Sequence, residues 1–168
     1  ISQDKKNINV KNYASQIDQF ALILAAACHD VGHSGMDNMF LHKYQTGLHF
    51  IFPEIGPYEQ VHASIGFSLI MEHNFIEEDL KALRIKFIEF ILTTDMTSHF
   101  QFCDRMKQID AKMLKNVYDG KIDDPEIINQ IRWWRFKVII KLADISNPCR
   151  AFHLAEYWAY SYTNECRS

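Results

Sequence analysis

The chain has 168 residues, of which 48% are hydrophobic and 23% charged, proportions typical of a globular domain large enough to bury a core. The net charge of -3 argues against a nucleic-acid partner, and no basic run is long enough to suggest an anionic membrane surface. The longest apolar stretch, residues 20–28, is far too short to cross a membrane.

The apolar residues recur with a helical period along most of the chain, and no alternating strand pattern is sustained. Residues 1–16 are predicted to begin the chain as a frayed polar arm or loop. The next segment, 17–28, is apolar almost all round, as in a buried helix. Further helices are predicted over residues 59–74, 80–91, 99–118, 125–144 and 152–165. The sequence therefore predicts one all-α domain, a compact bundle of about six or seven helices.

The cysteines indicate a cellular compartment, and the chain ends indicate a longer protein. The four cysteines are scattered and form no CxxC pair: Cys28, Cys103, Cys149 and Cys166. This pattern favours a reducing compartment, so we expect the cytoplasm or the cytoplasmic face of a membrane. The chain begins with Ile1 and ends inside a predicted helix, and we expect both ends to be cuts in a longer protein.

A first candidate site follows the buried helix, at residues 28–35 (CHDVGHSG). Imidazole and carboxylate are ligands for zinc and for harder divalent ions. Adjacent His29 and Asp30 would point about 100° apart on a helix, so they can clasp one ion only where the backbone changes course. Gly32 and Gly35 allow such a change. Taken alone, the segment fits equally well a polar helix terminus in which Asp30 caps the next segment.

A second candidate site closes the apolar run 138–143, where Asp144 precedes Asn147 and Pro148. A carboxylate at the inner end of an apolar helix is costly to bury unless it is paired or binds a metal. The alternative is a turn residue that bonds the backbone before Pro148. Together with His29 and Asp30, however, Asp144 completes the three protein ligands that a catalytic divalent ion requires. A carboxylate shared between two ions would make a two-metal centre.

Other polar residues carry weaker signals. Thr94 follows an apolar helix and could reach metal-bound water, although a helix cap is the commoner explanation. Glu59 and His62 fit either a second layer around a metal or a solvated helix start. The remaining histidines fit surface or structural roles, namely His42, His49, His73, His99 and His153.

Three segments resemble the catalytic domain of class I 3′,5′-cyclic-nucleotide phosphodiesterases. They are residues 29–35 continuing through 38–41 (NMFL), residues 92–96 (LTTDM) and residues 143–148 (ADISNP). A looser match runs from 58 to 67, and order and spacing agree from about residue 17 to the end. The His-Asp pair alone would indicate only the wider HD superfamily, whereas the other two segments are specific.

The resemblance implies a chemistry. His29, Asp30 and Asp144 would bind zinc, and Asp30 would bridge to a second ion, magnesium or manganese. A hydroxide between the two metals would attack phosphorus and open cyclic AMP or cyclic GMP to the 5′-monophosphate. The resemblance does not indicate which nucleotide is preferred.

The resemblance also implies roles for five further residues. His33, Glu59 and Thr94 match catalytic positions that hold metal-bound waters and the phosphate. Asn147 matches a position near the purine, and Met96 matches a residue that lines the substrate pocket.

The departures from the family pattern matter as well. An upstream His-Asn-x-x-His motif, which would supply a fourth zinc ligand and the acid for the leaving oxygen, is absent from this sequence, as is the downstream glutamine that grips the purine. Gly32 stands where a second Asp is usual, Val61 where a histidine is usual, and Pro53 where an Asn-Asp pair begins. We therefore expect this chain to bind metal weakly and to turn over slowly or not at all.

Two other readings stay open. One is a different HD-superfamily phosphohydrolase that acts on linear nucleotides. The other is a non-catalytic helical module that senses a nucleotide or binds a partner protein. Under every interpretation we expect neither nucleic-acid nor membrane contact by this segment, and we expect self-association if truncation exposes apolar surface.

Overall fold

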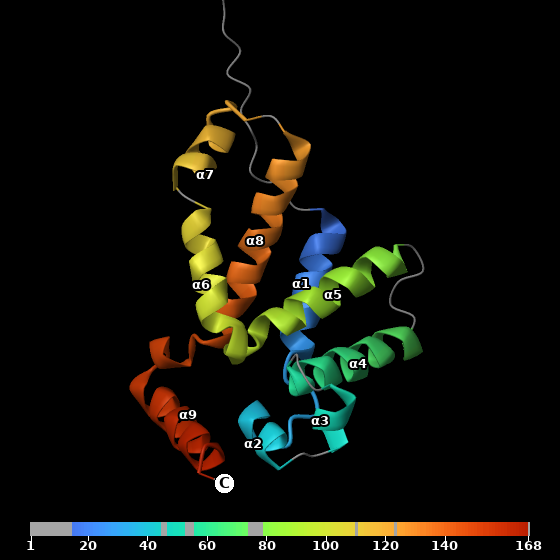
Figure 1. The fold of residues 1–168 in the computed structure, drawn as a ribbon, viewed down its shortest axis with the longest axis vertical. Coiled ribbons are helices and arrows are strands. Elements are labelled where there is room, and N and C mark those ends of the chain that lie inside the picture. The colour runs from blue at the N-terminus through green and yellow to red at the C-terminus, as the bar shows by residue number, and fades with distance from the viewer. Residues whose placement is uncertain are drawn as a thin grey trace, which may run out of the picture.

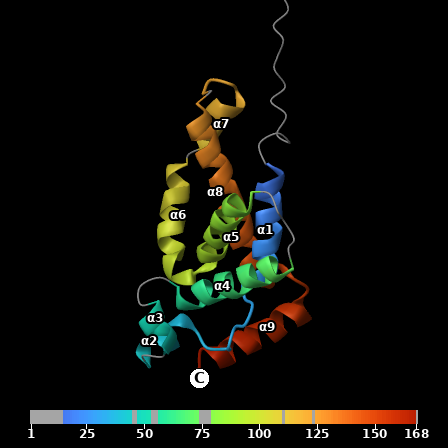
Figure 2. The same cartoon turned by 90° about the vertical axis from the view of Figure 1, so that its right-hand side faces the viewer.

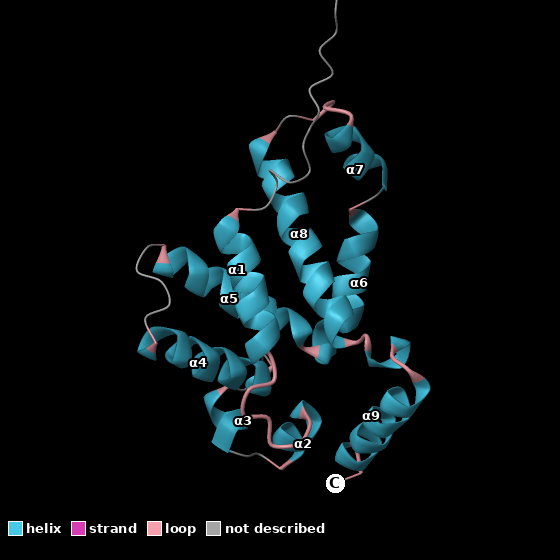
Figure 3. Cartoon of the chain, turned by 180° about the vertical axis from the view of Figure 1, so that it is seen from behind, coloured by secondary structure: helices cyan, strands magenta, loops and turns pink. Residues whose placement is uncertain are grey.

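The computed structural model describes residues 15–44, 47–52, 56–73, 79–109, 111–122 and 124–167. All regular elements in these residues are helices (Figure 3), which confirms the all-α fold. In chain order they are α1 (Gln16–Cys28), α2 (Asn38–Lys43), α3 (Gly47–Ile51), α4 (Pro57–Glu72), α5 (Leu80–Thr94), the 3-10 turn η2 (Met96–Ser98), α6 (His99–Gln108), α7 (Ala111–Tyr118), α8 (Pro125–Asp144), the 3-10 turn η3 (Asn147–Cys149) and α9 (Phe152–Glu165).

The observed helices differ from the predicted ones in several places. The short helices α2 and α3 lie in a stretch for which the sequence predicts no helix, and the predicted helix 99–118 is divided into α6 and α7. The division falls at Ile109, whose ψ of 73° leaves the helical region. Of the predicted arm, residues 1–16, positions 1–14 lie outside the described residues. Ser15 is the N-cap of α1, where it forms a capping box with Asp18, and Gln16 is the first residue of the helix.

The centre of the molecule is α5, which packs against α1, α4 and α8 (Figure 1). Its inward face carries large side chains with no exposed surface, while α1 presents small ones. The buried members of this core from these four helices are Ala21, Ala25, Ala63, Ile70, Leu83, Phe87, Phe90, Ile91, Phe136 and Ile140. Because alanines face α5 from α1, the two helices can approach closely around the phenylalanines.

Gly66 marks the closest approach of α4 to the core. A Cβ built at this position would lie 2.8 Å from both the Cβ of Cys28 and the Cζ of Phe87. The residue is helical, so its lack of a side chain serves close packing rather than an unusual backbone conformation. α4 is thereby held against the end of α1, directly before the first candidate site.

A buried ion cluster joins α1, α5 and α8. Asp18 has no exposed surface, and its carboxylate lies 2.5 Å from the Lys86 ammonium and 3.6 Å from Arg132 Nε. Burial alone would raise the pKa of Asp18, but hydrogen bonds from Lys86 and Ser15 together bring it below its ordinary value. The cluster therefore fixes the three helices relative to one another at the end remote from His29.

The C-terminal helix α9 stands apart from this core at the lower end of the molecule (Figures 1 and 2), where its main contacts are with η3. Several of its aromatic side chains are exposed: Phe152, Tyr157, Trp158, Tyr160 and Tyr162. No described helix has the length and apolar character needed to cross a membrane. All four cysteines are free thiols.

Candidate active site

His29 is where the two predicted sites meet. It caps the C-terminus of α1, and its Nδ1 lies 2.9 Å from the carbonyl oxygen of Ala26. Its Nε2 lies 3.3 Å from Asp30 Oδ2 and 3.3 Å from Asp144 Oδ1, at the end of α8. The structure therefore brings together all three residues that the sequence predicts as metal ligands, from two helix ends that are far apart along the chain.

The contacts among these three residues are charged. The carboxylate of Asp144, followed by that of Asp30, raises the pKa of His29 to about 10. The same contact with His29 lowers the pKa of Asp30. At neutral pH the His29 ring is therefore an imidazolium between two carboxylates. Any metal that binds Nε2 must displace the proton on that atom.

The turn that presents His29 and Asp30 depends on two glycines. Gly32 has a φ of 78° and Gly35 a φ of 81°, both in the left-handed region that side chains disfavour. This confirms the expected change of course after α1. At Gly32 a Cβ would also lie 3.0 Å from Ile65 Cδ1, so a side chain at this position would require Ile65 to shift.

Beside Asp30, three aromatic rings pack together between the turn and α4. The His33 ring lies 4.6 Å from that of Tyr58 and 5.6 Å from that of His62, centroid to centroid. The Tyr58 hydroxyl bonds the Ser34 hydroxyl, and His33 Nδ1 accepts the Gly35 N–H at 3.0 Å. In the neutral His33 ring the proton is therefore on Nε2.

His62 lies closer to the candidate metal ligands than its weak sequence signal suggests. It is 1% exposed, and among the described residues neither ring nitrogen has a hydrogen-bond partner of good geometry. Burial lowers the pKa of His62, against the opposing charge of Asp30. The backbone of His29 also opposes the fall in this pKa, so the buried imidazole lies against the end of α1, in the group of rings beside the candidate ligands.

Glu59 lies in the first turn of α4, half-buried and bonded by the Nδ2 of Asn38 at 2.9 Å. Asn38 also accepts the backbone N–H of Tyr58 at 3.2 Å, so it fixes the start of α4. Burial raises the pKa of Glu59, and the charges of Asp95 and Asp30 add to the rise. Glu59 therefore lies close enough to Asp95 and Asp30 for their negative charges to act on it. Asn38 enters the prediction only as part of a motif, because an amide carries no signal of its own.

Thr94 and Asp95 lie where α5 ends and η2 begins. Thr94 is buried, and its hydroxyl donates to the carbonyl of Ile91 in its own helix at 2.7 Å. The neighbouring Asp95 instead uses its carboxylate to accept the backbone N–H and the hydroxyl of Thr97, at 2.8 and 2.6 Å. The role predicted for Thr94 stays a prediction, and it requires the hydroxyl to rotate away from α5.

The two residues predicted to bind the nucleotide lie at the edge of this arrangement. Met96 is 56% exposed on η2, and Asn147 begins η3 between α8 and α9. Neither takes part in the contacts described above for the acidic cluster and the rings. Their roles in substrate binding stay predictions.

By type and direction the donors fit a divalent cation. One imidazole nitrogen and two carboxylates converge, and the Nδ1 contact with Ala26 orients Nε2 as the coordinating atom. Both carboxylates, however, contact the same His29 nitrogen directly, and this is the atom that would bind the metal. Accordingly, within the described ranges no group of three or more His, Cys, Asp or Glu side chains stands ready to hold a metal. The carboxylates would have to move away from His29 to admit one.

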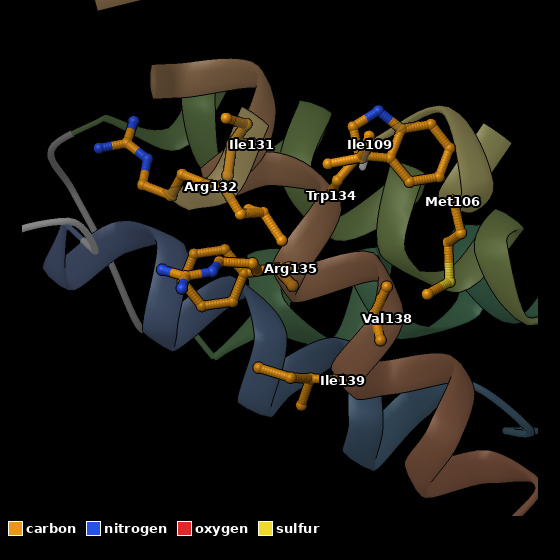
Figure 4. Close-up of a pocket in the computed structure, with 10 residues that line it drawn as sticks. Met106, Ile109, Ile131, Arg132, Trp134, Arg135, Val138 and Ile139 are labelled. Carbon is orange, nitrogen blue, oxygen red and sulfur yellow. The ribbon is translucent and has the colours of Figure 1, made fainter. Parts of the chain in front are cut away.

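A cavity of about 500 Å³ lies elsewhere, between α6, α7 and α8 (Figure 4). Its walls are mainly apolar and include Met106, Ile109, Trp134 and Val138. It contains none of the predicted site residues. The candidate site is therefore argued from the convergence of charged side chains and not from this cavity.

Comparison with known proteins identifies the family of this chain. The profile of the 3′5′-cyclic nucleotide phosphodiesterase family matches residues 5–168. The chain is 30% identical to the 3′,5′-cyclic-nucleotide phosphodiesterase regA of Dictyostelium discoideum, over 95% of this chain and 20% of that protein. It is also 30% identical to the human high affinity cAMP-specific and IBMX-insensitive 3′,5′-cyclic phosphodiesterase 8A, over 93% of this chain and 21% of that protein.

A solved structure gives the same result for the fold. The phosphodiesterase domain of the RhoPDE fusion protein from the choanoflagellate Salpingoeca rosetta superimposes with a TM-score of 0.74 at 25% identity, covering 90% of this chain and 48% of that one. The chain thus spans about a fifth of these curated relatives and about half of the solved domain. On the family match along nearly its whole length, the chain belongs to the 3′,5′-cyclic nucleotide phosphodiesterase family.

Proposed function

We propose that this chain forms part of the active site of a metal-dependent enzyme that hydrolyses 3′,5′-cyclic AMP or cyclic GMP to the 5′-monophosphate. The observation that carries the proposal is the convergence of His29, Asp30 and Asp144 from the ends of α1 and α8. The names of the relatives support the reaction class. They include a cAMP-specific, a cGMP-specific and a dual phosphodiesterase, so both nucleotides are candidate substrates.

His29 and Asp144 would hold a zinc ion, and Asp30 would contribute to that ion and to a second one, magnesium or manganese. The bound ions would supply Lewis acidity and an activated water for attack on a phosphodiester. The residues around them would do the rest. Asp30 is the most exposed of the three, with 66% of its side chain accessible, and is therefore best placed to face a substrate.

Glu59 and His33 would orient the reacting groups. Burial raises the pKa of Glu59, so this carboxyl is suited to exchange a proton with water at the site. The neutral His33 ring carries its proton on Nε2, because Nδ1 accepts from Gly35. It would donate that proton in a hydrogen bond to a phosphate oxygen. Thr94 would join them once its hydroxyl leaves the carbonyl of Ile91.

The isolated chain would be a weak or inactive catalyst. Its sequence contains no His-Asn-x-x-His motif, and general acid catalysis typically contributes about 10²–10⁴-fold to a rate. Metal affinity would also be modest, since the three ligands must first separate from one another. We therefore expect slow turnover at best.

The test is to supply cyclic AMP and cyclic GMP separately to the chain with zinc and magnesium, and to separate the products by chromatography. We expect slow release of a 5′-monophosphate that stops in Asp144→Ala and with a chelator, but continues in Asp119→Ala, an exposed residue paired with Lys121. If turnover is too slow to see, a cyclic nucleotide should still raise the melting temperature of the metal-loaded chain. Release of a 3′-monophosphate, equal rates in the two variants, or neither product nor stabilisation would contradict the proposal.

A further inference from the structure

A buried lysine lies in the last turns of α8, close to the candidate active site. Lys141 is 2% exposed, and it is the single charged residue in the apolar run 138–143. Its ammonium donates to the carbonyl oxygen of Thr94 at 3.1 Å and to that of Asp95 at 2.8 Å. A buried ammonium is costly unless it is paired or hydrogen-bonded, so these two bonds account for its tolerance in the core.

The two carbonyls belong to the C-terminal end of α5. The last carbonyl groups of a helix lack partners within it and carry partial negative charge, so a cation nearby stabilises them. α5 has no basic residue in its own last turn. Lys141 supplies the missing cation from α8, and the end of α5 is thereby fastened to α8.

This attachment lies beside the proposed metal ligands. Lys141 precedes Asp144 by three residues, about one helical turn. On its other side, the carboxylates of Asp95 and Glu59 border Gly56 at the start of α4, where a Cβ would lie 3.2 Å from Asp95 Oδ2 and 2.5 Å from Glu59 Oε2. Three helix ends therefore meet around one ammonium, and Figure 1 shows the ends of α5 and α8 coming together.

The charges around Lys141 agree with this position. Burial lowers the pKa of its ammonium, while the negative charges of Asp144, Asp95 and Glu59 oppose that change. Lys141 is thus a buried cation near these three carboxylates, whereas Asp30 is the exposed carboxylate of the site.

We propose that Lys141 is a positioning residue of this active site, which sets the separation of Asp144 from Thr94 and Glu59. It would act on metal and substrate only through those residues. The inference rests on the proposed function, because positioning matters only if the acidic cluster binds metal. A lysine that served the fold alone would stabilise the chain and leave metal binding unchanged.

The chain contains a matched control one turn earlier on the same helix. Lys137 also reaches from α8 to α5, where its ammonium lies 2.8 Å from Glu89 Oε1, and its side chain is 17% exposed. Lys137→Met removes a bond between the same two helices away from the cluster. Lys141→Met removes the two bonds at the cluster and keeps the length of the apolar stem.

The experiment is a titration of each chain with Co²⁺, followed by its visible absorption, which reports the number and geometry of ligands. We expect Lys141→Met to weaken Co²⁺ binding by about 10–100-fold, as for other residues that orient ligands, and to change the spectrum. Lys137→Met should leave affinity and spectrum unchanged. Lys141→Gln, which keeps one amide donor, should fall between the unsubstituted chain and Lys141→Met, and it serves as the test if Lys141→Met does not fold.

If the lysine 141 variants and Lys137→Met bind Co²⁺ with the affinity and spectrum of the unsubstituted chain, the positioning role is wrong and Lys141 serves the fold alone. If the unsubstituted chain itself binds no Co²⁺, the proposed metal site is wrong, and the inference falls with it. The two failures are therefore distinct.

Discussion

The helices α5 and α9 show two different relations to the rest of the molecule. α5 is surrounded by α1, α4 and α8, and four of its side chains have no exposed surface. α9 contacts mainly η3 and exposes five aromatic side chains. The proposed metal ligands and Lys141 belong to the first region, whereas Asn147 lies on the way to the second. Ligand geometry should therefore depend on the core, and nucleotide contacts on the α8–α9 connection.

The largest expected effect is on stability, from truncation of a core side chain. Phe87→Ala removes a fully buried ring and should cost about 3–5 kcal/mol of unfolding free energy. Tyr160→Ala removes a ring that is 72% exposed on α9 and should change it by less than about 0.5 kcal/mol. Urea unfolding followed by circular dichroism measures both. Similar losses in the two variants would mean that α9 is packed as tightly as α5.

A smaller loss of stability is expected from adding a methyl group where helices are in contact. Gly66→Ala would place a Cβ 2.8 Å from Cys28 and Phe87, and such overpacking typically costs about 1–3 kcal/mol. Gly47→Ala is the control, because nothing lies within 4 Å of its added Cβ. Thermal unfolding of the two variants compares them directly. Equal melting temperatures would show that α4 can shift away from α1 and α5 without cost.

The smallest expected effect is a change in the pH dependence of stability, through Asp18. Its pKa is lower in the folded chain than the ordinary value of 3.8, so its contribution is complete above that pH and is lost as the pH falls through the folded value. Asp18→Asn should therefore flatten the acid side of a stability profile measured between about pH 2 and pH 5. An unchanged slope would show that the carboxylate gains nothing from Lys86.

The sequence predicts the fold class and most long helices because their apolar period is strong and their ends carry clear signals. α8 begins at Pro125 as predicted, and the Asp124 carboxylate before it accepts the N–H of Glu126. The division at Ile109 was not predictable, because an amphipathic pattern continues across it. The helices α2 and α3 are too short to produce a periodic signal.

For the site, the sequence identifies the residues that the structure brings together in His29, Asp30 and Asp144. It does not reveal the closed contacts among them, since those depend on how α1 and α8 cross. The sequence does not predict the buried position of the Lys141 ammonium, for a related reason. A lysine in an apolar run usually extends its ammonium to solvent, and only the position of the α5 carbonyls shows that this one does not.

The most direct test of the account is zinc binding by calorimetry, with Asp144→Asn compared against Asp119→Asn. The account predicts that the unsubstituted chain and Asp119→Asn bind zinc with the same affinity and release protons, because His29 must lose its proton to bind metal. Asp144→Asn should bind at least about 10-fold more weakly, since it loses a charged ligand. No zinc binding by the unsubstituted chain, or equal binding by Asp144→Asn, would contradict the account.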